Sequence, residues 1–160
     1  MPRPGAETVF GPAADLAEAL RDADMIVAAI PSHGMREVLR RAAPFVQSAA
    51  IVVSAAKGLE QQTLFRPSEI VQQEFRSRVR ISVLSGPSFA SEMARELPTA
   101  VCVASADALV VERVQADFRA PYFRLYGTHD VLGVEIGGAL KNVIAIAAGV
   151  AEGLGLGQNA

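Results

Sequence analysis

Short, almost wholly apolar runs recur along the chain, and amphipathic stretches separate them. Runs of this length predict strands, and the amphipathic stretches between them predict helices. The predicted strands are Met25–Ile30, Ile51–Ser54, Ile81–Leu84, Ala100–Ala104 and Tyr122–Tyr126. Strands that alternate with helices are typical of βαβ units, and continuously apolar strands indicate a sheet that is covered on both faces. We therefore predict an α/β fold with a parallel sheet and flanking helices.

The predicted helices include one long stretch that could also be considered as a membrane span. They are Pro12–Arg21, the stretch from Ser32 as N-cap through Arg41, Pro67–Arg76, Ala106–Phe118 and Val131–Glu152. The last stretch contains Glu135, Lys141 and Asn142. Each of these side chains is costly at the centre of a bilayer. We therefore expect this stretch to be a buried helix of a globular protein.

The composition excludes several classes of protein. A hydrophobic share of 51% argues against disorder, and a net charge of −2 gives no basic surface for nucleic acid. Cys102 is the only cysteine and lies in an apolar run, so we expect neither a disulfide framework nor a thiolate metal site. Two histidines cannot form a convincing zinc site either, and we expect no metal. A single cysteine fits a reducing cytoplasm best, and Met1–Gly11 contains no apolar signal segment.

Polar or glycine-containing segments follow three of the predicted strands. They are Pro31-Ser32-His33, Ala56-Lys57-Gly58 and Ser85-Gly86-Pro87-Ser88. Ligands of doubly wound sheets bind at the carboxyl ends of the strands, so these segments predict a binding site. Turns after strands are also rich in glycine and serine for structural reasons alone, and that alternative stays open for each single segment.

The distribution of lysine singles out two positions. Thirteen of the fifteen basic residues are arginine, and the two lysines are Lys57, directly after a predicted strand, and Lys141, within the most apolar helix. An ammonium group can exchange its proton near neutral pH, whereas a guanidinium group stays protonated. These two lysines are therefore the best candidates for proton transfer.

Lys141 has no anionic neighbour on its own helix. The residues three and four positions away are Gly137, Gly138, Ile144 and Ala145. Burial of a lysine without an anion favours its neutral form, which a general base requires. The glycines are unfavourable inside a helix and indicate close approach of another backbone or of a ligand. The alternative is a lysine whose ammonium group reaches solvent beside a tightly packed helix pair.

A dinucleotide-binding sheet normally carries G-x-G-x-x-G after its first strand, and no such segment occurs in this chain. Two interpretations follow. The fold does not bind a dinucleotide, or the first βαβ unit lies outside this sequence.

Three segments resemble the middle of the bacterial NAD(P)-dependent glycerol-3-phosphate dehydrogenases. They are Ala56-Lys57-Gly58-Leu59-Glu60, the segment Ser85–Ala90 with Glu92 and Leu97-Pro98-Thr99-Ala100, and the block Gly133–Gly149 around Lys141 running on to Asn159. Pro31-Ser32-His33, followed by Arg36-Glu37-Val38-Leu39, fits the same family. The resemblance implies a partial Rossmann-like NAD(P)-binding domain over residues 1–129 and the first long helix of an all-helical substrate domain over residues 130–160.

The resemblance also implies an activity. Members interconvert sn-glycerol 3-phosphate and dihydroxyacetone phosphate with NAD or NADP as cofactor, supply phospholipid synthesis, and are usually cytoplasmic homodimers without membrane insertion. By position, Lys141 matches the proton acceptor, and Lys57 matches the lysine that touches cofactor and substrate. Gly86, Ser88 and Asn142 match substrate contacts. Ala90 and Pro31 match cofactor contacts.

Against the family pattern, the sequence starts after the glycine-rich loop and stops shortly after Asn159. We therefore expect an internal fragment that neither binds NAD tightly nor turns over alone. Two alternatives stay open. One is a related dehydrogenase of the 6-phosphogluconate or ketopantoate type, and the other is a non-catalytic Rossmann-like scaffold module.

Overall fold

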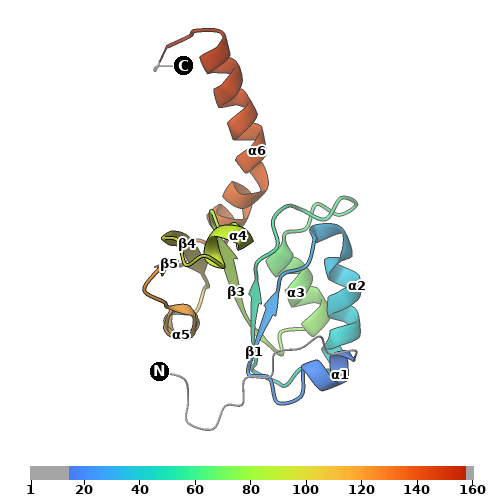
Figure 1. The fold of residues 1–160 in the computed structure, drawn as a ribbon. Coiled ribbons are helices and arrows are strands. Elements are labelled where there is room, and N and C mark those ends of the chain that lie inside the picture. Colours follow the sequence, from blue (N-terminus) through green and yellow to red (C-terminus); the bar gives the residue numbers. More distant parts are fainter. Residues whose placement is uncertain (1–14, 158–160) are drawn as a thin grey trace.

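The computed structural model describes residues 15–157, which form a five-stranded sheet with helices on both faces (Figure 1). The strands are β1 Met25–Ala28, β2 Ile51–Ser54, β3 Arg80–Ser85, β4 Thr99–Ala104 and β5 Phe123–Thr128. The helices are α1 Leu16–Ala19, α2 Ser32–Ala42, η1 Ala43–Phe45, α3 Pro67–Phe75, α4 Ala90–Met93, α5 Ala108–Phe118 and α6 Val131–Gly153. The predicted α/β class, with a long final helix, is confirmed.

The predicted parallel direction is wrong at one strand pair. The strand order is β1-β2-β3-β4-β5, and β1, β2 and β3 run parallel, as do β4 and β5. β4 runs antiparallel to β3, with Ser85 opposite Cys102. The connection between these strands contains only α4, a helix of four residues. Because no long helix carries the chain across a face of the sheet, the strand returns in the opposite direction.

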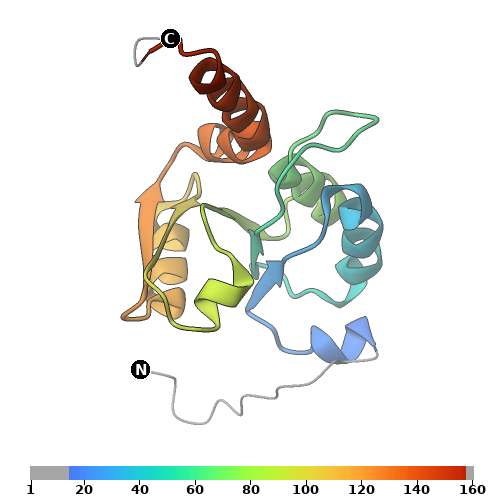
Figure 2. The same cartoon turned by 45° about the horizontal axis from the view of Figure 1, so that its top comes forward.

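Hydrophobic side chains fill the space on both faces of the sheet. On one face, α2 and α3 pack with Val52 of β2, and on the other α5 packs with Ile51 and Val53 (Figures 1 and 2). All four residues of β2 are buried, as expected for a strand covered on both faces. The same expectation is wrong for β1, where Val27 is 48% exposed, because α5 packs against β3, β4 and β5.

Two helix starts differ in detail from their prediction. Pro31 is the N-cap of α2, so Ser32 is the first helical residue rather than the cap, and Pro31 has no side-chain donor or acceptor to offer. Of the predicted helix Pro12–Arg21, α1 covers Leu16–Ala19, and residues 12–14 lie outside the described residues.

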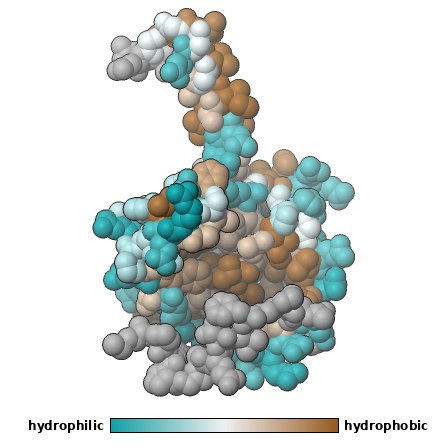
Figure 3. Space-filling model, in the orientation of Figure 1, coloured by the Kyte–Doolittle hydropathy of each residue, from teal (hydrophilic) through white to brown (hydrophobic). Residues whose placement is uncertain are grey.

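The long helix α6 projects from the body of the protein (Figure 1). Glu135 is its only buried residue, so the expectation of a buried helix is wrong for most of its length. No described element covers its distal part, which is largely apolar on the surface (Figure 3). Among the described residues, α6 is the one helix long and apolar enough to cross a membrane, although only 6% of its most apolar window is buried.

Candidate active site

The ends of β2 and β3 bring two of the predicted segments together. The two strands are parallel, so their carboxyl ends lie at the same edge of the sheet. Lys57 follows the end of β2, and Gly86 follows the end of β3. The Lys57 Nζ atom donates a hydrogen bond of 2.7 Å to the Gly86 carbonyl oxygen. This bond holds the Lys57 ammonium group beside the segment that carries Ser88.

The third predicted segment lies next to the Lys57 loop. Gly58 adopts a φ of +105°, and a Cβ atom at this position would come within 3.4 Å of the Ser32 Oγ atom. Gly58 therefore permits the start of α2 to lie beside the loop that follows β2. The ends of β1 and β2 meet here, as the predicted site requires.

Helix α6 packs against the end of β3 through one glycine. A Cβ atom on Gly138 would lie 2.8 Å from Ser85 Oγ and 3.9 Å from Lys57 Cγ. A close approach therefore occurs at Gly138, where the neighbour is a side chain rather than the predicted backbone or ligand. At Gly137 a Cβ atom would meet nothing within 4 Å in the protein, so the approach of a ligand there stays a prediction. Asp130 caps this helix, because its Oδ1 atom accepts a 2.8 Å hydrogen bond from Gly133 N.

A cavity of about 740 Å³ lies between α6 and the ends of the strands. Four of the predicted site residues line it, namely Lys57, Gly86, Ser88 and Lys141. The two lysines of the sequence thus lie on one cavity, although they are far apart in the chain. Two ammonium groups that line the same cavity favour an anionic ligand.

Three other predicted site residues do not line this cavity. Pro31 is exposed at the start of α2, and Ala90 is exposed as the first residue of α4. Asn142 is exposed beside Lys141 and accepts a 2.7 Å hydrogen bond from its Nζ atom. Asn142 therefore contacts the catalytic candidate rather than the cavity wall.

Lys141 is exposed, so its predicted burial is wrong. It lies three residues after Gly138 on α6, at the start of the exposed part of this helix. Its partner Asn142 is neutral, which agrees with the expectation of no carboxylate at helical spacing.

Sequence reasoning missed several residues of this region. Cys102, Thr128 and Asp130 also line the cavity, and Cys102 is exposed there rather than buried in an apolar strand. Its position follows from the antiparallel pairing with Ser85, which the sequence did not reveal. Glu135 is buried although it is charged, and an isolated acid in an apolar helix was the signal available for it. Residues 15–157 contain no group of three or more potential metal ligands.

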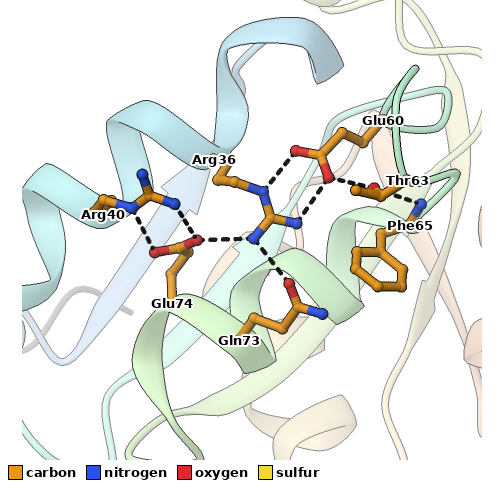
Figure 4. Close-up of polar contacts among 7 residues, drawn as sticks. All are labelled: Arg36, Arg40, Glu60, Thr63, Phe65, Gln73 and Glu74. Atoms are coloured by element: carbon orange, nitrogen blue, oxygen red, sulfur yellow. Dashed lines mark hydrogen bonds and ion pairs between the residues drawn. The ribbon is translucent and has the colours of Figure 1, made fainter.

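An arginine network holds the loop that carries Lys57 (Figure 4). Arg36 of α2 donates to both carboxylate oxygens of Glu60, each at 2.7 Å, and it also binds Glu74 and Gln73 of α3. The hydrogen bonds from Arg36 lower the pKa of Glu60 to about 2. Thr63 donates a further hydrogen bond to Glu60. The loop between β2 and α3 is therefore fixed to both helices on this face.

Comparison with known proteins gives a consistent result. Residues 7–111 match the family described as NAD-dependent glycerol-3-phosphate dehydrogenase N-terminus, and residues 130–160 match its C-terminus. The chain is 50% identical over 147 residues to a glycerol-3-phosphate dehydrogenase (NAD(P)+) of Leptospira biflexa, covering 91% of this chain and 44% of the relative. It is 49% identical over 160 residues to the glycerol-3-phosphate dehydrogenase (NAD(P)+) of Geobacter metallireducens, covering 98% of this chain and 48% of that relative.

Solved structures agree in fold. The glycerol-3-phosphate dehydrogenase of Coxiella burnetii superposes with a TM-score of 0.78 at 35% identity, covering 91% of this chain and 44% of that one. The glycerol-3-phosphate dehydrogenase of Plasmodium falciparum superposes with a TM-score of 0.80 at 29% identity, covering 91% of this chain and 41% of that one. The chain thus spans less than half the length of these relatives. On the match of residues 7–111 together with these similarities, the chain belongs to the NAD-dependent glycerol-3-phosphate dehydrogenase family.

Proposed function

We propose that this chain carries the catalytic lysines of an enzyme that interconverts sn-glycerol 3-phosphate and dihydroxyacetone phosphate with NAD(H) or NADP(H). The observation that carries the proposal is the meeting of Lys57 and Lys141, the two lysines of the sequence, on one cavity. The enzyme would work in the cytoplasm as a homodimer and supply glycerol 3-phosphate for phospholipid synthesis. Residues 1–129 would belong to its cofactor domain, and residues 130–160 would begin its helical substrate domain.

Lys141 would act as the base and acid of the reaction. When glycerol 3-phosphate is oxidised, the neutral Nζ atom of Lys141 takes the proton from the hydroxyl group on C2 while hydride leaves the same carbon. In the reverse direction the ammonium group returns the proton to the developing alkoxide. Asn142, which accepts a hydrogen bond from Lys141 Nζ, would orient this group and contact the substrate.

Lys57 would supply fixed positive charge next to the substrate. Its Nζ atom is already oriented by the Gly86 carbonyl oxygen, so little reorganisation is needed when negative charge develops on the substrate oxygen. Gly86 and Ser88 line the same cavity and would contact the substrate, which is anionic through its phosphate.

The residues at the strand ends fit a nicotinamide dinucleotide. Pro31, Lys57 and Ala90 follow β1, β2 and β3, three neighbouring parallel strands, so they lie along the edge at which such sheets bind dinucleotides. When bound, the nicotinamide accepts or gives the hydride. The described residues would hold the cofactor and position the substrate against it.

A chimera tests this function. The chain replaces the segment of the Geobacter metallireducens relative with which it aligns over 160 residues. We expect the chimera to oxidise glycerol 3-phosphate with NAD or NADP, measured as absorbance of the reduced nicotinamide. A folded chimera without this activity would contradict the proposal and favour the scaffold alternative. Activity only toward 6-phosphogluconate or ketopantoate would favour the related dehydrogenases.

We further infer that the 160 residues alone neither bind NAD tightly nor turn over. The chain spans 44% of the Leptospira biflexa relative, and Lys141 stands exposed on a projecting helix. Isothermal titration with NAD and the same absorbance assay would measure both properties. Robust turnover by the isolated chain would refute this inference.

A further inference from the structure

Glu135 is the buried residue that joins α6 to the rest of the protein. Its side chain is 1% exposed and accepts three hydrogen bonds from the start of α3, each of 2.7 Å. The donors are the Ser68 backbone N–H, the Ser68 hydroxyl and the Arg66 guanidinium group. A carboxylate so buried is costly unless it is paired and hydrogen-bonded, and here both oxygens are satisfied.

The bonds of Glu135 fix the rotation of α6 about its axis. In an α-helix each residue turns by about 100°, so Gly137 and Lys141 point about 120–160° away from Glu135. Those two residues line the cavity, whereas Glu135 faces Arg66 and Ser68 on the opposite side of the helix. A helix held by Glu135 at α3 and by Gly138 at Ser85 therefore has one rotational setting. Lys141 lies about 9 Å farther along the axis than Glu135, on the unsupported part of the helix.

We propose that Glu135 is a positioning residue that places Lys141 opposite Lys57. It acts through the helix and touches neither the substrate nor the reacting atoms. A rotation of α6 would move Lys141 away from the cavity while leaving Lys57, which is held by Gly86, in place. The inference rests on the proposed function only for the chemical role of Lys141, because the placement itself is a property of the fold.

The position of Lys141 relative to the cavity can be measured through a single cysteine. Cys102 is the only cysteine, is exposed and lines the cavity that Lys57 and Lys141 also line. A nitroxide spin label on Cys102 broadens the NMR signals of nearby groups. With the side chains of both lysines isotope-labelled in the full chain, we expect one side-chain ammonium signal from each lysine, and we expect the label to broaden both signals.

The Glu135→Gln variant removes the charge but keeps the size of the side chain. Its amide nitrogen cannot accept a hydrogen bond, so the variant loses either the bond from the Ser68 backbone N–H or the two bonds from Arg66 and the Ser68 hydroxyl, which share one oxygen. We expect Lys141 to lose most of its broadening and Lys57 to keep the wild-type value. The matched control is Asp117→Asn, which breaks an arginine ion pair on α5, away from the cavity, and should alter neither lysine.

Two outcomes would overturn the proposal. An equal loss of broadening at Lys57 and Lys141 would mean that Glu135 only maintains the fold. Unchanged broadening at Lys141 would mean that Glu135 does not orient the helix. If Glu135→Gln does not fold, Ser68→Ala decides, because it removes one of the three hydrogen bonds to Glu135 and leaves the ion pair between Glu135 and Arg66. It also removes the longer bond of 3.3 Å from Arg66 to the Ser68 hydroxyl. It should reduce the broadening at Lys141 alone, and no change would again overturn the proposal.

The chimera adds a kinetic measurement. A displacement of about 1 Å at a reacting group costs up to about 100-fold in rate, so we expect Glu135→Gln to lower kcat by about 10- to 100-fold. The KM for the cofactor should stay near its wild-type value, and an unchanged kcat would overturn the proposal. The spin-label experiment needs no turnover, so a failure of the proposed activity remains distinguishable from a failure of this inference.

Discussion

The backbone conformation and packing at position 86 require a glycine. Its φ of +154° and the 2.9 Å separation between a Cβ atom and Val101 Cα leave no room for a side chain. We expect Gly86→Ala to lower the free energy of unfolding by about 1–3 kcal/mol, because the new methyl group meets backbone. Urea denaturation measures the change. Gly34→Ala is the matched control, since it lies in α2 with nothing within 4 Å and should stabilise by up to about 1 kcal/mol.

A substitution at Lys141 can remove proton transfer while keeping the positive charge. Lys141→Arg in the chimera keeps a cation but replaces a titratable ammonium group with a guanidinium group that stays protonated. We expect kcat to fall by about 100- to 10,000-fold, the usual contribution of a general base, with little loss of cofactor affinity. Steady-state kinetics with a cofactor titration tests this, and near-wild-type turnover would exclude Lys141 as the base.

Lys57→Ala should instead raise the KM for substrate as well as lower kcat.

At the residue scale, the sequence predicted which lysines line the cavity better than it predicted their burial. Lys57 and Lys141 were identified by their rarity and by the segments around them, and both line the cavity. The exposure of Lys141 could not be predicted, because it depends on what packs against α6. Glu135 was missed as a structural residue because its partners, Arg66 and Ser68, lie far away in sequence. Ion pairs between distant segments leave no periodic signal.

At the scale of elements, the loop between β2 and α3 depends on the Arg36–Glu60 pair. The pKa of Glu60 falls from 4.5 to about 2 on folding, so its stabilisation is complete above pH 4.5 and is lost as the pH falls through about 2. We expect Glu60→Gln to cost about 1 kcal/mol at pH 7, since the pair is partly open to water. The difference from wild type in free energy of unfolding should shrink between about pH 4.5 and 2.

The pH dependence is checked by urea denaturation at a series of pH values. Arg36→Met removes the same pair from the other side, so its difference from wild type should shrink over the same interval. A difference for Glu60→Gln that stays constant down to about pH 2 would show that the carboxylate is not held by Arg36 in the way the geometry indicates.

Elements with uniform local signals were the easiest to predict. The apolar run Ile51–Ser54 is a strand with the predicted bounds, and α6 has nearly the predicted length. The direction of β4 could not be predicted, because its run Ala100–Ala104 is as continuously apolar as the parallel strands, although its residues are in part alternately exposed. Its direction is set by the connection from Ser85 to Thr99, where the one helix is too short to cross a face of the sheet.

For the whole molecule, the arrangement of α6 links stability to the site. The base of the helix is held by Glu135 and Gly138, and Lys141 lies farther along the chain, where the helix is exposed. The cavity therefore has one wall on the rigid sheet and another on a helix that is supported at one end. This explains why the two lysines lie on one cavity while their surroundings differ, with Lys57 bonded to the backbone and Lys141 to a neighbouring side chain.

The exposed part of α6 also predicts how the isolated chain behaves in solution. Val143, Ile146, Val150 and Leu154 are each more than half exposed and recur at helical spacing, so they form one apolar stripe (Figure 3). Apolar surface that is contiguous and exposed drives association. We therefore expect the 160-residue chain to self-associate through this stripe, with an average mass that rises with concentration in sedimentation velocity.

Charge placed on the stripe should reverse this association. Ile146→Glu together with Val150→Glu puts two carboxylates on the apolar face, where a second copy would have to desolvate them, and should shift the chain toward monomer. Ala145→Glu with Ala148→Glu adds the same charge at exposed positions of the same helix but away from the stripe, and should leave the association unchanged. If both pairs dissociated the protein equally, net charge rather than the apolar stripe would govern association. If neither pair changed the mass, the contact would lie elsewhere on the molecule.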